Sequence, residues 1–209
     1  MIRPPGRLHV LTDARGGQPA LDAVAAAIAA GAPVVQVRAK GCTDRELYDF
    51  ARAVVDLCVP ARTTCLVNDR VDIALAVGAD GTHLGAGDLP LAAARRVAGP
   101  GHLLGGTARE PGLARRLVAE GADYLGVGPA YPTQTKTGLP DALGPAGVRA
   151  VAEAVDVPVI AIGGVTAARV AELLAAGATG VAVVGAVSGA ADPGAATREL
   201  LTALGSDLR

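Results

Sequence analysis

A short phrase repeats four times along the chain and constrains the fold more than any other feature of the sequence. Each copy is a helical stretch that ends in Gly-Ala and runs into a short apolar segment: AAGAPVVQV at 29–37, AVGADGTHL at 76–84, AEGADYLGV at 119–127 and AAGATGVAV at 175–183. Glycine suits the left-handed position that closes a helix, and near-continuous Val, Ile and Leu are typical of strands buried on both faces. The period of about 45 residues is too long for one strand–helix unit and suits two.

The intervening units are visible between these copies. Further strands are predicted at 8–12, 64–68, 102–106 and 158–164. Helices are predicted at 43–57 and 166–177, each capped by a threonine, and Glu46 completes a capping box with Thr43. Eight strand–helix pairs predict one (β/α)8 TIM-barrel domain over residues 1–209, with frayed ends at 1–6 and 205–209. An open doubly wound sheet is the alternative.

Charge and composition argue against several classes of protein. The net charge of −1 gives no electrostatic footprint for nucleic acid or an anionic membrane. No apolar run reaches the roughly 20 residues of a membrane span, and the N-terminus does not read as a signal peptide. Three cysteines, Cys42, Cys58 and Cys65, lack metal-like spacing, which predicts free thiols in a reducing cytoplasm. A homodimer is left open.

Lysine is scarce, and its two positions are informative. The chain has 17 arginines but only two lysines, Lys40 and Lys136, and each follows an apolar strand. Lysine is a compact point charge that arginine does not replace at a tight phosphate site. In VQVRAK, the residues Gln36, Arg38 and Lys40 alternate, so they share one face of the strand. This pattern predicts an anion site.

Active sites of such barrels lie at the carboxyl ends of the strands. Asn68 and Asp69 follow the third predicted strand, Asp88 follows the fourth, and Thr107 follows the fifth. Two carboxylates together with a substrate phosphate are a common way to hold Mg²⁺, whereas helix capping is the alternative for each aspartate. The histidines are predicted to be structural, because all three sit on strands without evident partners: His9, His83 and His102.

A second anion site is predicted at the last two strands. IAIGGVT and VAVVGAV place glycine-rich turns after strands seven and eight, where backbone N–H groups can bind one phosphate. The loop at 129–144 contains PTQTKTG and is long enough to serve as a lid. One phosphate site and one site for a diphosphate with Mg²⁺ indicate a transferase with two phosphorylated substrates.

These segments resemble the thiamine phosphate synthase family. The resemblance covers about residues 8 to 200 and rests on VVQVRAKG, LVNDRVDIALAVGADGTHLGAGD, GADYLGVGPAYPTQTKTG and AIGGVT followed by GVAVVGAV. It implies an enzyme that joins 4-amino-2-methyl-5-(diphosphomethyl)pyrimidine to the phosphate of 4-methyl-5-(2-hydroxyethyl)thiazole, or to its carboxylated form, and releases diphosphate.

The resemblance also implies a role for individual residues. Contacts to the pyrimidine diphosphate fall on Gln36, Val37, Arg38, Ala39, Lys40, Asn68, Thr107 and Lys136. Contacts to the thiazole phosphate fall on Thr133, Gln134, Thr135, Gly164, Val184 and Gly185. Asp69 and Asp88 are the implied Mg²⁺ ligands, and Arg38, Lys40 and Lys136 are implied to be catalytic, neutralising charge on the departing diphosphate.

Three positions depart from the usual family pattern. The family commonly has Gln where Ala86 stands and Ser where Thr107 and Gly185 stand, and only Ala86 loses a polar group outright. Three rival functions stay open at this point. They are a thiazole tautomerase of the same fold, a sugar-phosphate isomerase or epimerase, and a non-catalytic barrel that senses thiamine phosphate.

Overall fold

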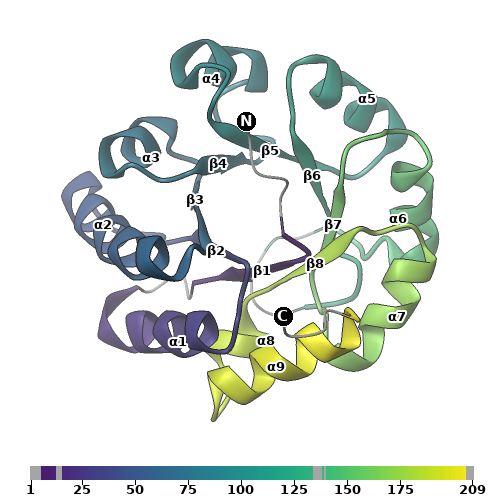
Figure 1. Ribbon diagram of the computed structural model, residues 1–209. Coiled ribbons are helices and arrows are strands. Elements are labelled where there is room, and N and C mark those ends of the chain that lie inside the picture. Colours follow the sequence, from purple (N-terminus) through teal and green to yellow (C-terminus); the bar gives the residue numbers. More distant parts are fainter. Residues whose placement is uncertain (1–5, 13–15, 134–137, 139, 206–209) are drawn as a thin grey trace.

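The protein is a closed barrel of eight parallel strands. The computed structural model describes residues 6–12, 16–133, 138 and 140–205. The strands pair in chain order, and β1 also pairs with β8, so the predicted barrel is confirmed and the open sheet is wrong (Figure 1). The strands are β1 Leu8–Leu11, β2 Val34–Val37, β3 Thr64–Asn68, β4 Gly81–Leu84, β5 Leu103–Ala108, β6 Tyr124–Val127, β7 Val159–Ile162 and β8 Gly180–Val183.

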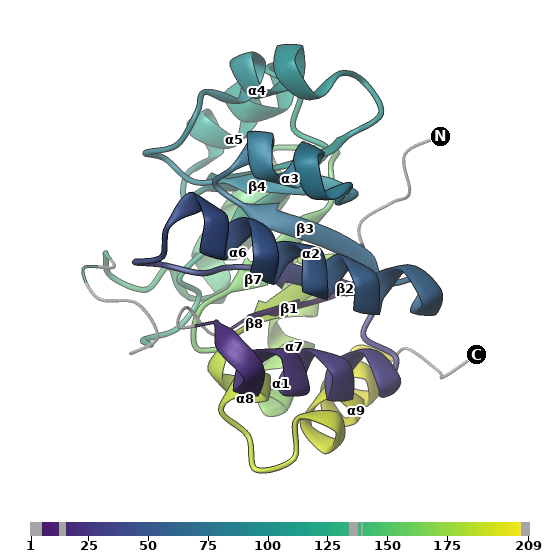
Figure 2. The same ribbon diagram turned by 90° about the vertical axis from the view of Figure 1, so that its left-hand side faces the viewer.

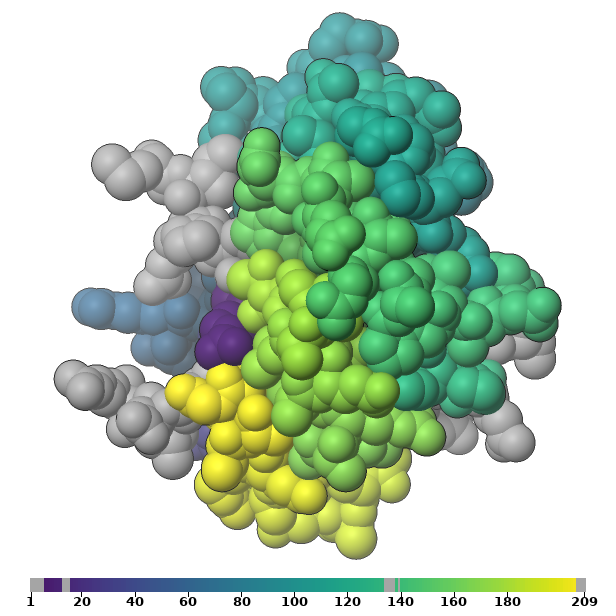
Figure 3. Space-filling model, turned by 90° about the vertical axis from the view of Figure 1, so that its right-hand side faces the viewer, coloured from purple at the N-terminus to yellow at the C-terminus, as the bar shows by residue number. Residues whose placement is uncertain are grey.

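Helices surround the barrel and cover the outer faces of its strands. They are α1 Gly17–Ala29, α2 Asp44–Ala61, α3 Val71–Val77, α4 Leu91–Ala98, α5 Pro111–Ala119, α6 Gly144–Ala152, α7 Ala167–Ala175, α8 Gly185–Ser188 and α9 Pro193–Ala203. Figure 2 shows α1 and α2 side by side on one flank, and Figure 3 shows α6, α7 and α9 (green to yellow) on the opposite flank. Among the described residues, no helix combines the length and apolarity needed to cross a membrane.

The predicted helix boundaries are confirmed in most respects. Gly31, Gly78, Gly121 and Gly177 all adopt positive φ within two residues of the ends of their helices. The capping box of α2 is present, because the Thr43 hydroxyl accepts from the N–H of Glu46. Two details differ. Thr166 occupies the N-cap of α7 without a side-chain hydrogen bond, and α2 runs beyond the predicted end at 57 to Ala61. The ends predicted to fray lie almost wholly outside the described residues.

The core has two parts, one inside the barrel and one between strands and helices. Inside, the strands contribute alternate residues such as Val34, Leu66, Leu103 and Ile160. Outside, small and branched side chains of the strands pack against the helices. Burial of both strand faces explains the near-continuous apolar runs of the sequence.

Glycines make room inside the barrel for the largest side chain there. Tyr124 is 1% exposed, and it points inward from β6. A Cβ atom on Gly105, in the neighbouring strand β5, would lie 2.2 Å from Tyr124 Cζ. A Cβ atom on Gly126 would likewise lie 2.8 Å from His83 Cε1. The glycines at these two positions therefore allow two rings to enter the barrel.

Candidate active site

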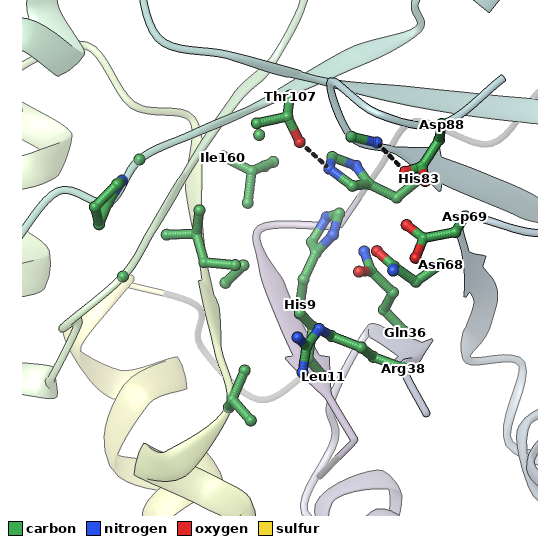
Figure 4. A pocket seen from close by; sticks show the side chains of 18 of the residues that line it. His9, Leu11, Gln36, Arg38, Asn68, Asp69, His83, Asp88, Thr107 and Ile160 are labelled. Carbon is green, nitrogen blue, oxygen red and sulfur yellow. Dashed lines mark hydrogen bonds between the residues drawn. The ribbon is translucent and has the colours of Figure 1, made fainter. Parts of the chain in front are cut away.

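A cavity of about 450 Å³ opens at the carboxyl ends of the strands. Its lining comes from all eight strands or from the loops that directly follow them, as the barrel predicts. Figure 4 shows polar side chains from the first half of the chain on one side of the cavity and apolar ones such as Ile160 on the other. The cavity thus has a charged side and an apolar side.

The charged side of the cavity includes residues from β2 and from the loop that follows it. Gln36, Arg38 and Lys40 all line the cavity, which confirms that they share one face. The backbone at Arg38 is held by Thr12, whose Oγ1 donates to Arg38 O at 2.9 Å and accepts from Arg38 N at 2.8 Å. Thr12 is 1% exposed. Sequence reasoning missed this positioning residue, because a threonine at a strand end gives no signal of its partner.

Asp69 and Asp88 face the same cavity, and neither caps a helix. Asp69 has φ of 68°, an uncommon conformation that places it between β3 and α3, while the N-cap position of α3 is Arg70. Asp88 Oδ2 accepts from Gly85 N at 2.7 Å, and the N-cap of α4 is Pro90. The capping alternative is therefore wrong for both aspartates, whose carboxylates are left to act in the cavity.

The two carboxyl groups interact with each other and with Lys40. Lys40 Nζ forms an ion pair with Asp69 Oδ2. Burial raises the pKa of Asp69, but hydrogen bonding with Asp88 and Lys40 outweighs burial and holds that pKa below its ordinary value. Burial and the neighbouring Asp69 raise the pKa of Asp88. Two interacting carboxyl groups are suited to a divalent cation, which would neutralise both.

His83 lies in the cavity wall, and the prediction that it lacks a partner is wrong. Its Nδ1 lies 3.0 Å from Tyr124 Oη. Its Nε2 lies 2.9 Å from Thr107 Oγ1, the bond drawn in Figure 4. His9 Nε2 donates to Gly6 O at 3.0 Å, and His9 also lines the cavity. His102 Nε2 pairs with Thr82 Oγ1 at 2.9 Å, away from the cavity lining. All three histidines therefore have hydrogen-bond partners, and of the three only His102 lies away from the cavity lining.

The glycine-rich turns close the cavity at β7 and β8. Gly163 and Val184 line it, whereas Gly164 and Gly185 lie one position farther along the chain. Among the described residues, the N–H groups of Gly164 and Gly185 have no backbone acceptor. A Cβ atom on Gly164 would lie 2.7 Å from Pro132 O, so the loop after β6 presses closely on this turn. These N–H groups are available to an anion.

The remaining predicted residues divide into three groups. Asn68, Thr107 and Thr133 line the cavity, and so does Ala86, which adds only a methyl group there. The side chains of Val37 and Ala39 pack in the cluster beneath α2, so only their backbone could reach a ligand. Gln134, Thr135 and Lys136 lie outside the described residues.

The sequence profile of the thiamine monophosphate synthase family matches residues 8–187. The chain belongs to this family. It is 59% identical over 202 residues to the thiamine-phosphate synthase of Salinispora tropica, covering 95% of this chain and 97% of that one. It is 47% identical over 190 residues to that of Haloquadratum walsbyi, covering 90% and 85%. The solved structure of thiamine phosphate pyrophosphorylase from Pyrococcus furiosus superposes with a TM-score of 0.87 at 36% identity, and 97% of each chain is covered.

The buried histidines predict how stability depends on pH. Burial lowers the pKa of His9 to about 3 and that of His83 to about 4, while the unfolded chain retains the ordinary value near 6.5. Between these values the unfolded chain binds protons that the folded protein does not, so stability is full above about pH 6.5 and falls as the pH decreases. We expect a loss of at least about 2 kcal/mol between pH 7 and pH 5, measured by urea unfolding. Equal stability at both values would show that the rings are protonated inside the barrel.

Proposed function

We propose that the cavity is the active site of a thiamine phosphate synthase. The enzyme joins 4-amino-2-methyl-5-(diphosphomethyl)pyrimidine to 4-methyl-5-(2-phosphooxyethyl)thiazole, or to its carboxylated form, and releases diphosphate. One observation carries the proposal: a single cavity combines the cationic side chains of Arg38 and Lys40, which follow β2, with two interacting carboxylates, and it is bordered by the glycine-rich turns after β7 and β8. The exposed, free thiol of Cys42 fits a reducing compartment, and we place the enzyme in the cytoplasm.

The charged side of the cavity serves the departing diphosphate. Arg38 and Lys40 offer positive charge where negative charge builds up as the carbon–oxygen bond of the pyrimidine substrate breaks. Lys136 is assigned the same role by the family pattern, although it lies outside the described residues. The amino group of the pyrimidine donates electrons into the resulting cation, so the substitution is dissociative and requires no covalent bond to the protein.

Asp69 and Asp88 are the proposed Mg²⁺ ligands. Both supply carboxylate oxygens, both line the cavity, and the two carboxyl groups interact with each other. The two carboxylates would hold Mg²⁺, which would supply further charge neutralisation for the leaving group. Lys40, already paired with Asp69, lies beside this position and links the metal ligands to the diphosphate site.

The other end of the cavity holds the nucleophile. The N–H groups at Gly164 and Gly185, with Val184 between strand and helix, are suited to the phosphate of the thiazole. Thr133 lines the cavity close to this end, and Gln134 and Thr135 are assigned to the same phosphate by the family pattern. Anchoring the phosphate positions the thiazole nitrogen for attack on the pyrimidine cation. The loop at 129–144 is proposed to exclude water, which would otherwise capture that cation.

A direct assay tests the proposal. Purified protein is mixed with both substrates in the presence of Mg²⁺ or EDTA, and thiamine phosphate is followed by its thiochrome fluorescence. We expect product with Mg²⁺ and almost none with EDTA. A folded protein that binds the thiazole phosphate but forms no product would favour a tautomerase or a sensor instead.

Replacing Asp88 by asparagine is expected to raise the Mg²⁺ concentration needed for half-maximal rate by about tenfold or more, because one of two charged ligands becomes neutral. Initial rates are measured across a Mg²⁺ titration with both substrates saturating. Asp56→Asn removes the same charge from the exposed face of α2 and should leave the titration unchanged. An unaltered titration for Asp88→Asn would remove this residue from the metal site.

A further inference from the structure

Three polar side chains from three strands form a continuous hydrogen-bonded row in the wall of the cavity. Tyr124 Oη on β6 lies 3.0 Å from His83 Nδ1 on β4, and His83 Nε2 lies 2.9 Å from Thr107 Oγ1 on β5. All three residues line the cavity, and Figure 4 shows the imidazole of His83 turned toward Thr107. Of these three residues, the family resemblance assigns a ligand contact only to Thr107, so the functions of His83 and Tyr124 are open.

The protonation states of His83 and Tyr124 in this row can be assigned. A doubly protonated ring would donate from both nitrogens and leave the buried Tyr124 hydroxyl without an acceptor, so the row requires a neutral ring with one N–H donor and one acceptor nitrogen. Burial raises the pKa of Tyr124, so the phenol keeps its proton. The two nitrogens of His83 therefore play opposite roles toward Tyr124 and Thr107.

Tyr124 decides the direction of the row. The residue is 1% exposed, and His83 Nδ1 is the sole hydrogen-bond partner of its hydroxyl among the described residues. A buried hydroxyl proton without an acceptor is costly, so Tyr124 donates to Nδ1. His83 then carries its proton on Nε2 and donates to Thr107 Oγ1. The hydroxyl proton of Thr107 is left without a protein acceptor in the described part of the chain, and it is available to the cavity.

We infer that Tyr124, His83 and Thr107 form a one-way relay that offers a hydrogen-bond donor to a ring nitrogen of the pyrimidine substrate. The identity of that ligand rests on the proposed function, whereas the direction of the relay does not. Thr107 touches the ring, and His83 and Tyr124 are positioning residues that act through it. A ring without an acceptor nitrogen leaves the Thr107 donor unpaired, so the relay selects a heteroaromatic ring over a carbocyclic one.

The first test reads the relay without any ligand. Two-bond ¹H–¹⁵N correlation spectra of uniformly ¹⁵N-labelled protein distinguish the two neutral histidine tautomers, and the His83→Gln spectrum identifies the signals of His83. We expect the Nε2–H tautomer in the wild-type protein. We also expect a detectable Nδ1–H population in Tyr124→Phe, which keeps the ring and removes the hydroxyl. The Nδ1–H tautomer in the wild-type protein would overturn the inference, because the row would then run in reverse.

The second test measures the effect of the Thr107 hydrogen-bond donor on ligand affinity. The probes are the pyrimidine diphosphate and benzyl diphosphate, whose ring has no acceptor nitrogen, and both affinities are measured by calorimetry with Mg²⁺. The wild-type protein should prefer the pyrimidine by tenfold or more. Thr107→Ser should keep this preference, and Thr107→Val, which has nearly the same shape, should lose most of it. Full preference in Thr107→Val would overturn the inference.

A matched pair of variants separates the relay from general packing. Tyr124→Phe should weaken binding of the pyrimidine diphosphate by about three- to tenfold and leave binding of benzyl diphosphate unchanged. Tyr48→Phe removes a hydroxyl from α2, outside the barrel, and should alter neither affinity. If Tyr124→Phe does not fold, the two Thr107 variants decide. The product assay tests whether the protein is a synthase, and the tautomer of His83 is measured without catalysis. The two proposals can therefore fail independently of each other.

Discussion

Replacing Lys40 by methionine is expected to lower kcat by about a hundredfold while the protein stays folded. Lys40 lines the cavity and forms an ion pair with Asp69. Methionine removes the positive charge that would stabilise the leaving diphosphate, and it also leaves the negative charges of Asp69 and Asp88 without this partner. Losing one donor to a developing negative charge typically costs a factor of about 10² to 10³ in kcat. Steady-state kinetics with both substrates at saturating Mg²⁺ gives the value.

The control is Arg52→Met, which removes a positive charge from an exposed ion pair on α2. It should leave kcat within about twofold, because exposed pairs contribute little. Lys40→Arg should recover only part of the rate, since a planar guanidinium does not occupy the position of an ammonium group. A rate for Lys40→Met close to that of the wild-type protein would show that Lys40 does not stabilise the departing diphosphate.

Replacing Gly105 by alanine is expected to destabilise the protein by about 1–3 kcal/mol or more and to weaken binding of the pyrimidine diphosphate. The added Cβ would lie 2.2 Å from Tyr124 Cζ and 2.4 Å from its Oη, which no real contact tolerates. Tyr124 therefore has to move, and its hydrogen bond to His83 is lost. Urea unfolding measures the first effect, and calorimetry measures the second.

Gly112→Ala is the matched control. Gly112 lies in the first turn of α5, where an added Cβ atom has no neighbour within 4 Å. Alanine is the better helix former by about 0.8–1 kcal/mol, so this variant should be as stable as the wild-type protein or slightly more stable. If Gly105→Ala behaved in the same way, the barrel interior would be far more adaptable than its packing indicates.

Much of the barrel could be predicted from the sequence because its evidence is local. Gly-Ala followed by an apolar run marks the end of a helix and the start of a strand, and both features lie within a few residues. The inward face of Gln36, Arg38 and Lys40 follows from the period of a strand, and the cavity confirms it. The position of the site then follows from the general placement of active sites in such barrels.

The parts that could not be predicted depend on distant contacts. Tyr124 on β6 reaches His83 on β4 across Gly105 on β5, and no local pattern reveals that three strands cooperate in this way. The aspartates were misleading for a different reason, because a residue just before a helix usually caps it. The positive φ of Asp69 breaks that expectation, and a single sequence does not display it.

Closure of the barrel has a consequence for how the protein folds while it is being synthesised. β1 pairs with β8, Arg7 O accepts from Val181 N, and the Arg7 side chain donates to Leu204 O at the end of α9, so the start of the barrel is held by residues from the last described strand and helix. Because these contacts span nearly the whole chain, they form only after almost all of it has left the ribosome. Every strand also contributes to the cavity lining. A nascent chain can therefore gain helices early, but the lining of the cavity is complete only after β8 and the turn that follows it have been synthesised.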